Sequence, residues 1–168
     1  MLLYEYTNTA VQEARDVNWK FSGDRPVYQQ IMENIRGAVL RGDMGPITVG
    51  ADTNIQDGAI LHEETVVGRG CTIGHGAIVH GCTVGDNTLI GMGAIVLDDA
   101  VVESNTIVAA GSVVTKGTVV ESGWVYAGTP AKKMKQLGEE LLKGEVERIV
   151  NAYSMYASWY EDENQEAE

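Results

Sequence analysis

The chain of 168 residues contains 24 acidic and 12 basic residues, which gives a formal net charge of −12. Its length suits one domain with a hydrophobic core of its own, and its acidity argues against nucleic acid or an anionic membrane surface as a partner, because both would repel it. Hydrophobic residues make up 44% of the chain, but no apolar run reaches the length of about 18 residues that a membrane-spanning helix needs.

The amino-terminal segment, residues 1–38, carries no repeat, and the sequence leaves its structure open. Within it and just beyond, the stretch Arg25–Leu40 favours a helix. The first residues lack the basic region and long apolar stretch of a secretion signal. Two cysteines, Cys71 and Cys82, are too few for a disulfide framework. We therefore expect a cytoplasmic protein with reduced thiols.

Residues 39–128 are dominated by an aliphatic residue that recurs every six positions, with one slip of phase after Val79. The aliphatic positions are Val49, Ile55, Leu61, Val67, Ile73, Val79, Val84, Ile90, Val96, Val102, Val108, Val114 and Val120. A small residue follows four positions later, at Thr53, Ala59, Thr65, Cys71, Ala77, Thr83, Thr88, Ala94, Ala100, Thr106, Ser112 and Thr118. Neither a helix nor simple alternation has this period. Six residues suit one short strand and a corner, and three such units close a triangular coil of about 18 residues.

This pattern resembles that of hexapeptide-repeat proteins, and the resemblance implies a left-handed parallel β-helix. A C-terminal helix follows in the sequence, because Thr129–Pro130 is typical of a helix start and an amphipathic stripe runs from Val146 to Tyr160. The predicted fold is therefore all-β with a C-terminal α-helix. Its parts are the β-helix over residues 39–128, a helical segment over residues 129–160 and an acidic tail over residues 161–168.

The three histidines, His62, His75 and His80, fall within 19 residues. His62 and His80 each follow an inward aliphatic residue and are 18 residues apart, so we expect them to stack on one face with ring nitrogens near a shared ion. His75 follows its aliphatic residue by two positions on the preceding face, so a neighbouring subunit would have to supply it. The spacing thus favours an intersubunit metal site over three ordinary surface histidines.

Several motifs resemble those of the γ-class carbonic anhydrase family. They are Arg41–Asp43, Asn54–Gly58, Leu61–His62, Gly74–Gly76, Val79–Gly81, Ile90–Gly93 and Gly128–Lys132. The resemblance covers roughly residues 38–160 and implies a homotrimer with zinc, or else iron or cobalt, held by the three histidines at subunit interfaces. It also implies that Arg41 and Asp43 form a pair that links subunits and orders the site.

The resemblance further implies that Asn54 and Gln56 orient the bound water and substrate, with Asp57 beside them. Tyr153 corresponds to a tyrosine near the pocket. The implied activity is the reversible hydration of CO2 to bicarbonate. Three neutral imidazoles leave a coordination position open, and water bound there has its pKa lowered toward about 7, so that a hydroxide is available to attack CO2.

Other functions stay open at this point. Hexapeptide-repeat helices also host acyltransferases, a metal site would also suit a thioesterase, and a trimeric scaffold would bind metal for stability or not at all. Two acids, Glu63 and Glu64, either pass protons from the site or are solvated turn residues. Cys82 lies two residues after His80 and is either a thiolate ligand or a small residue in a turn.

Overall fold

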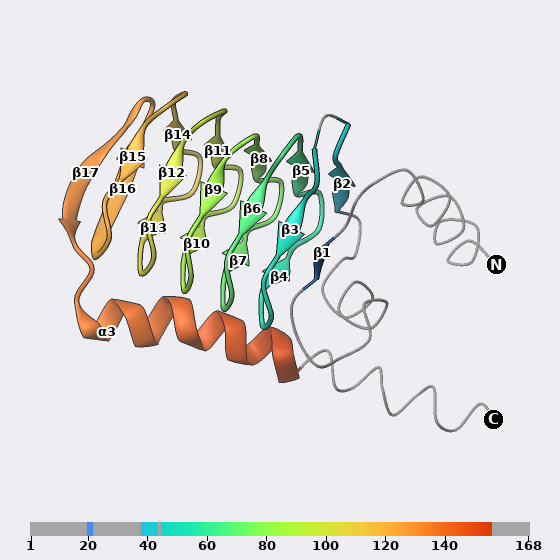
Figure 1. Ribbon diagram of the computed structural model, residues 1–168. Coiled ribbons are helices and arrows are strands. Elements are labelled where there is room, and N and C mark those ends of the chain that lie inside the picture. The colour runs from blue at the N-terminus through green and yellow to red at the C-terminus, as the bar shows by residue number, and fades with distance from the viewer. Residues whose placement is uncertain (1–19, 22–37, 44, 156–168) are drawn as a thin grey trace, which may run out of the picture.

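The protein is a triangular prism of short strands with a helix along one side, as Figure 1 shows. This computed structural model describes residues 20–21, 38–43 and 45–155. Along the repeat, successive strands belong to successive sheets, so the chain passes through all three sides before it returns to the first. The fold is the predicted left-handed β-helix.

The three sheets are named A, B and C here. Sheet A contains β1 (Lys20–Phe21), β3 (Thr48–Val49), β6 (Val66–Val67), β9 (Thr83–Val84), β12 (Val101–Val102) and β15 (Val119–Val120). Sheet B contains β4 (Asn54–Ile55), β7 (Thr72–Ile73), β10 (Leu89–Ile90), β13 (Ile107–Val108), β16 (Trp124–Gly128) and β17 (Ala131–Gln136). Sheet C contains β2 (Val39–Arg41), β5 (Ile60–His62), β8 (Ile78–His80), β11 (Ile95–Val96) and β14 (Val113–Val114).

The recurring aliphatic residues point into the prism and form one continuous core. Leu61, Ile73 and Ile90 are fully buried. Parallel pairing keeps equivalent positions of successive coils side by side, so Leu61 lies beside Val79. Each such side chain contributes roughly 1.5–3 kcal/mol when it is buried. The six-residue period therefore stabilises the prism by stacking like residues on one another.

The slip of phase has a specific place in the structure. Cys82 is 4% exposed and belongs to the core, whereas Thr83 is exposed in β9. The prediction that Thr83 is the inward small residue of this corner is therefore wrong. The corner is one residue shorter than the others. Cys82 occupies the inward small position three residues after Val79, whereas the other corners place that residue four positions after the aliphatic one.

Among the described residues, two strands precede the repeat. β1 pairs in parallel with β3 and extends sheet A. β2 pairs with β5, with Leu40 beside Leu61. The helix predicted over Arg25–Leu40 is wrong at its described end, because the backbone there pairs with the next coil, and residues 22–37 lie outside the described residues. Tertiary pairing overrides the local helical pattern here.

The chain that follows the prism also differs from the prediction at its start. Thr129 and Pro130 form a turn, and β17 then pairs antiparallel with β16. The predicted helix start at Thr129–Pro130 is wrong because the backbone of β16 offers unpaired N–H and C=O groups that a returning strand satisfies.

The helix begins at α3 (Glu139–Leu141), continues as the π-helix η1 (Leu142–Glu147) and remains helical over residues 148–155. Val146 of η1 is 1% exposed and packs with Ile107 and Val125, so the helix covers the outer face of sheet B. The predicted stripe is confirmed over its described part. Its last positions and the acidic tail lie outside the described residues.

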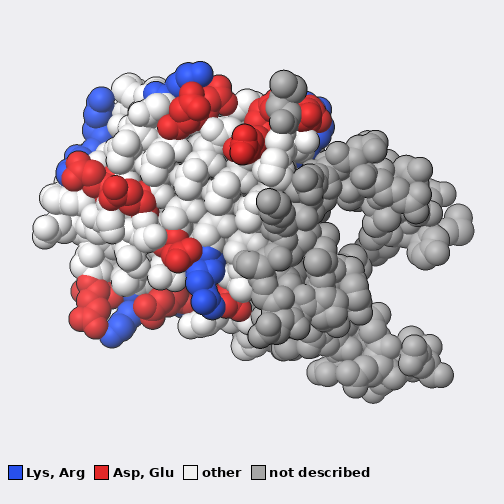
Figure 2. Space-filling model, in the orientation of Figure 1, with Lys and Arg blue, Asp and Glu red and all other residues white. Residues whose placement is uncertain are grey.

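Charged side chains lie mainly at the edges of the face shown in Figure 2, and uncharged atoms occupy its centre, over sheet A. The outward residues of that sheet include Val66, Val101 and Val119, which are 40%, 39% and 54% exposed. No helix in the described part of the chain is long and apolar enough to cross a membrane.

Candidate metal centre

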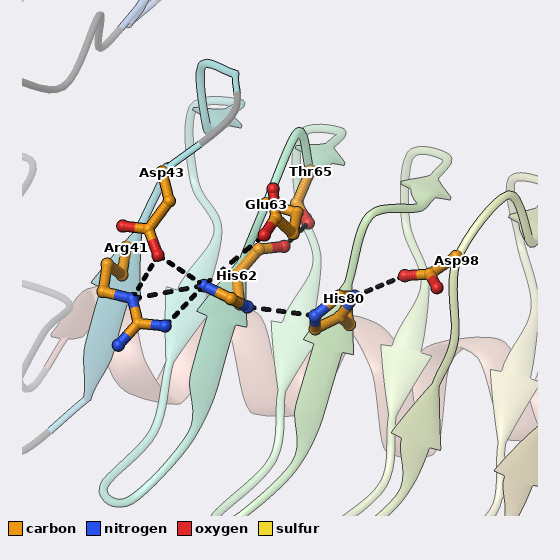
Figure 3. A network of polar contacts seen from close by, with 7 residues as sticks. All are labelled: Arg41, Asp43, His62, Glu63, Thr65, His80 and Asp98. Carbon is orange, nitrogen blue, oxygen red and sulfur yellow. Dashed lines mark hydrogen bonds and ion pairs between the residues drawn. The ribbon is translucent and has the colours of Figure 1, made fainter.

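His62 and His80 are neighbours on sheet C. They end β5 and β8 and pair in register, so their side chains project from the same face one coil apart. Nδ1 of His62 lies 3.0 Å from Nε2 of His80. Figure 3 shows the two rings in one row of polar side chains.

A carboxylate contacts the other nitrogen of each ring. Nε2 of His62 lies 3.1 Å from Oδ2 of Asp43, and Nδ1 of His80 is hydrogen-bonded to Oδ1 of Asp98. A carboxylate accepts hydrogen bonds only, so the contact with Asp98 requires a proton on Nδ1 of His80 and leaves the lone pair of Nε2 free. Nε2 of His62 faces both Asp43 and the guanidinium of Arg41, which only donates, so the tautomer of His62 is set by which of the two it pairs with.

The inner nitrogens, Nδ1 of His62 and Nε2 of His80, fit a metal ion. Two nitrogens bound to one tetrahedral ion at about 2.0 Å lie about 3.3 Å apart, close to the 3.0 Å between His62 and His80. A proton on Nδ1 of His62 makes this contact an N–H···N hydrogen bond to His80, and an ion bound by both rings would take the place of that proton. Carboxylates on the outer nitrogens are also the usual arrangement around metal-binding histidines. The donor set therefore suits a divalent ion that accepts imidazole ligands.

Arg41 belongs to the same cluster. Its Nε lies 2.8 Å from Oδ2 of Asp43, and its guanidinium also donates to Nε2 of His62, with Nε at 3.1 Å and a terminal nitrogen at 2.8 Å. The hydrogen bond from His62, together with the charge of Arg41, holds the pKa of Asp43 below its ordinary value. Asp43 is thus ionised at neutral pH and able to accept the ring proton of His62.

Two glutamates follow His62 in the turn between sheets C and A. Oε1 of Glu63 lies 3.8 Å from Nε2 of His62, and the ligand atoms of His62, Glu63 and His80 all lie within 4.8 Å of one another. The backbone of Glu63 is left-handed, with φ of 59°. The carbon atoms of the Glu64 side chain lie beside Gly45. Of the two acids, Glu63 is the one beside the histidine pair.

A second cluster surrounds His75, in the turn after β7. The backbone N–H of His75 donates to Oε1 of Gln56, and Nε2 of Gln56 donates to Oδ1 of Asn54. The amide of Asn54 in turn donates to Oγ1 of Thr72 and to the carbonyl of Cys71. A backbone donor at one end and a backbone acceptor at the other fix the orientation of both amides. Gln56 and Asn54 therefore hold the loop of His75.

Two more predicted residues flank the His75 ring. The hydroxyl of Tyr153, on the C-terminal helix, lies 3.4 Å from Nε2. Oδ2 of Asp57 lies 3.7 Å from Nδ1, which is beyond hydrogen-bonding distance. The ring is half exposed. His75 is therefore accessible to a group outside its own chain.

The predicted residues thus fall into two clusters on opposite edges of sheet C. Arg41, Asp43, His62 and His80 lie at the corner between sheets C and A. The cluster of His75 lies at the corner between sheets B and C. Among the described residues, the metal-ligating group that the fold gathers contains His62 and His80 but not His75. One chain holds two parts of the predicted site and does not join them.

Both cysteines are free thiols in the core. Burial raises the pKa of Cys71 to about 11 and that of Cys82 to about 12. A thiol with such a pKa stays protonated at neutral pH in the folded chain. Cys82 is 4% exposed inside the prism, whereas the side chain of His80 projects from its outer face, so Cys82 is a packing residue.

Asp98 is the residue that sequence reasoning missed. It lies 18 residues after His80, the same spacing that joins His62 to His80. The 18-residue spacing was therefore the signal that could have found it, although the slip of phase puts Leu97 in register with His80 and Asp98 in register with Gly81.

Comparisons with known proteins identify relatives of the chain. The family model described as bacterial transferase hexapeptide (six repeats) matches residues 81–116. The carbonic anhydrase of Geobacillus kaustophilus is 44% identical over 126 residues, which cover 73% of this chain and 69% of that protein. Mitochondrial gamma carbonic anhydrase 1 of Arabidopsis thaliana is 42% identical over 114 residues, or 62% of this chain. The match covers 42% of that plant protein, so this chain spans less than half of its length.

A solved structure resembles the fold as well. A hexapeptide transferase family protein from Anaplasma phagocytophilum is 44% identical, with a TM-score of 0.71 over 74% of this chain and 75% of that one. Fold and relatives together define a hexapeptide-repeat β-helix with histidines at its corners. The chain belongs to the γ-class carbonic anhydrase family.

Proposed function

We propose that this protein is a metal-dependent carbonic anhydrase, which hydrates CO2 reversibly to bicarbonate at sites between the subunits of a homotrimer. The observation that carries the proposal is the pair of ring nitrogens of His62 and His80, which face each other with a carboxylate behind each ring. Relatives named carbonic anhydrase, at 42% and 44% identity, support the activity.

The proposed ion is zinc, because neutral imidazoles are its ordinary ligands; ferrous iron and cobalt bind the same donors. When bound, such an ion supplies Lewis acidity that makes water a nucleophile at neutral pH. The chain's own residues orient the ligands of the ion. Asp43 and Arg41 contact the outer nitrogen of His62 and hold its ring in place, and Gln56 fixes the backbone of His75.

The two clusters support a three-fold assembly. They lie on the two edges of sheet C, so a ring of three prisms with sheet C turned inward brings the corner of His62 and His80 of one subunit to the corner of His75 of the next. Such a head-to-tail contact closes after three copies and makes three identical sites. Each site then has the third imidazole that neither cluster contains alone.

The outer face of sheet C fits this orientation. The outward residue that precedes the inward one is aliphatic in every strand of this sheet, at Val39, Ile60, Ile78, Ile95 and Val113, while Arg41, His62 and His80 are outward at the strand ends. Val39 is 51% exposed and Ile60 is 36% exposed in the single chain. An aliphatic row between two half-sites is the surface that an assembly through sheet C would bury.

The decisive experiment is stopped-flow CO2 hydration on protein purified without air and loaded in parallel with zinc or ferrous iron. His62→Ala removes one of the paired ligands and should abolish hydration. Thr115→Ala is its matched control, because Thr115 follows the inward Val114 at the same place of sheet C, further along the prism. The control should keep the wild-type rate.

Hydration that exceeds the buffer rate and disappears only in the His62 variant supports the proposal. One bound ion per chain without hydration for either metal would contradict it. The acyl-transfer, thioesterase and scaffold alternatives would then be tested with thioester substrates and by the stability of the assembly in a chelator.

A further inference from the structure

We propose that Asp98 is a positioning residue for metal binding, which fixes the protonated nitrogen and the direction of the His80 ring. The inference rests on the proposed metal site at His62 and His80. Asp98 itself lies in the turn after β11, one coil beyond His80, and its side chain is 44% exposed. Asp98 contacts the ring nitrogen of His80 that faces away from His62, so its role is exerted through His80.

The contact between Asp98 and His80 determines which nitrogen faces the site. Oδ1 of Asp98 accepts the hydrogen bond of Nδ1 in the His80 ring. A neutral imidazole carries one proton, so a proton on Nδ1 leaves the lone pair of Nε2 free. Nε2 is the atom that faces His62. Asp98 thus selects the tautomer that exposes a ligand lone pair to the site.

The fold leaves room for this contact at Gly81. A Cβ at Gly81 would lie 2.9 Å from Oδ1 of Asp98, which is closer than real Cβ contacts allow. The backbone of Gly81 is left-handed, with φ of 51°, and its carbonyl accepts the N–H of Asp99 at 2.8 Å. In the preceding coil, Glu63 follows His62 and carries a side chain. The glycine after His80 therefore admits the carboxylate of the next coil.

The short corner at Cys82 brings Asp98 within reach. Because that corner lacks one residue, Val96 pairs with Val79, and Asp98 comes to lie beside Gly81. From that place its side chain reaches back across the glycine to the outer nitrogen of His80. His62 has no equivalent partner from the following coil and uses Asp43 instead. The two rings thus receive carboxylates from opposite ends of the row in Figure 3.

A neighbouring acid provides a matched control. Asp99 follows Asp98 in the same turn but forms an ion pair with Lys116, at 3.2 Å. Asp99→Asn removes the same charge one residue away without touching His80, and asparagine tolerates its left-handed backbone. Asp98→Ala removes the acceptor, whereas Asp98→Asn keeps a carbonyl oxygen in its place. The three variants separate local charge from the hydrogen bond.

The first measurement is the affinity of the full chain for Zn²⁺ and Co²⁺, by competition with a chromophoric chelator. Asp98→Ala should lower the affinity for both ions by about 10- to 100-fold, the usual effect of removing a carboxylate behind a ligating histidine. Asp98→Asn should lower the affinity less than Asp98→Ala does. Asp99→Asn should keep the wild-type affinity within about twofold because an exposed charge is well screened. The visible absorption of bound Co²⁺ should change only in the Asp98 variants.

The second measurement needs no metal. Long-range ¹H–¹⁵N correlations of the histidine rings, recorded on metal-free protein above neutral pH, report which nitrogen carries the proton. The chain has three histidines, so His62→Ala and His75→Ala assign the signals of His80. The wild type and Asp98→Asn should show a proton on Nδ1, and Asp98→Ala should show increased protonation of Nε2.

These results are distinguishable from a failure of the proposed function. A wild-type protein that binds neither ion contradicts the metal site, while the ring signals still test Asp98. A wild type that binds metal, with unchanged affinity and unchanged His80 signals in Asp98→Ala, overturns the inference. A loss of affinity that is equal in the Asp98→Asn and Asp99→Asn variants overturns it too, because charge alone would then account for the effect.

Discussion

The hydroxyl of Tyr153 lies 3.4 Å from Nε2 of His75, although 78 positions separate the two residues in the sequence. The contact joins the C-terminal helix to the turn after β7. The helix thereby contacts the candidate site as well as covering sheet B. We expect Tyr153→Phe to slow CO2 hydration by about 2- to 10-fold, the value of one hydrogen bond.

Stopped-flow rates and urea unfolding of the same preparation check this expectation. His75→Ala should abolish CO2 hydration. Tyr153→Leu removes the aromatic ring as well as the hydroxyl, so any further loss of rate or stability relative to Tyr153→Phe measures the contribution of the ring to the packing of the helix. A Tyr153→Phe protein with the wild-type rate would show that the hydroxyl has no part in the reaction.

The oligomeric state should depend on sheet C and not on sheet A. Ile78→Glu places a carboxylate in the aliphatic row between the two half-sites and should release monomers of 18.1 kDa. Val101→Glu introduces the same charge at the equivalent outward position of sheet A and should leave the assembly intact. Sedimentation equilibrium measures both masses. Dissociation by Val101→Glu alone would mean that another face forms the interface.

Close stacking of the coils should make certain glycines irreplaceable. A Cβ at Gly91 would lie 2.5 Å from the backbone nitrogen of Ala110 in the next coil, so Gly91→Ala should destabilise the fold by about 1–3 kcal/mol. Gly144, in the helix, has open space around it, and Gly144→Ala should be neutral or stabilise by up to about 1 kcal/mol. Urea unfolding midpoints compare the two, and equal effects would contradict the packing argument.

The buried thiols predict a loss of stability in alkali. Burial raises the pKa of Cys71 to about 11 and that of Cys82 to about 12, above the ordinary value of 9.0. The unfolded chain therefore releases thiol protons from about pH 9 upward while the folded chain keeps them. Each thiol then lowers the free energy of unfolding by at most about 1.4 kcal/mol per pH unit, until the folded thiols ionise as well.

Urea midpoints between pH 8 and pH 10 measure this slope. The double variant Cys71→Ala, Cys82→Ala should show a shallower decline, and it should fold because Ala59 and Ala77 hold the inward small position elsewhere in the prism. An identical slope in the variant would mean that other groups cause the alkaline loss.

The repeat predicts the prism because the rule that produces the fold is local. Each coil places Leu61 on Val79 and His62 beside His80 by the same 18-residue step. The core and the histidine pair follow from that arithmetic. The same step from His80 reaches Asp98, but the short corner puts Asp98 beside Gly81, so its contact with His80 is a diagonal one that the repeat alone does not describe.

The ends of the prism escaped prediction for a different reason. β2 and β17 contain no hexad of their own and are strands because an adjacent strand offers unpaired backbone groups. Leu40 and Pro130 satisfy helical patterns in isolation, yet the neighbouring coil decides their conformation. Local sequence describes the repeating unit well and describes its boundaries poorly, since a boundary depends on what lies beside it.

β17 also gives the protein a finite length. Stacked parallel coils could in principle grow without limit, by adding the coils of another molecule end to end. On sheet B this growth stops, because β17 runs antiparallel and exposes Lys132, Lys133 and Lys135 at the margin. Charged side chains on an edge strand disfavour pairing with a further strand, and the reversed direction of β17 ends the parallel stacking of the coils. The last strand of sheet B therefore protects this end of the prism against fibre formation.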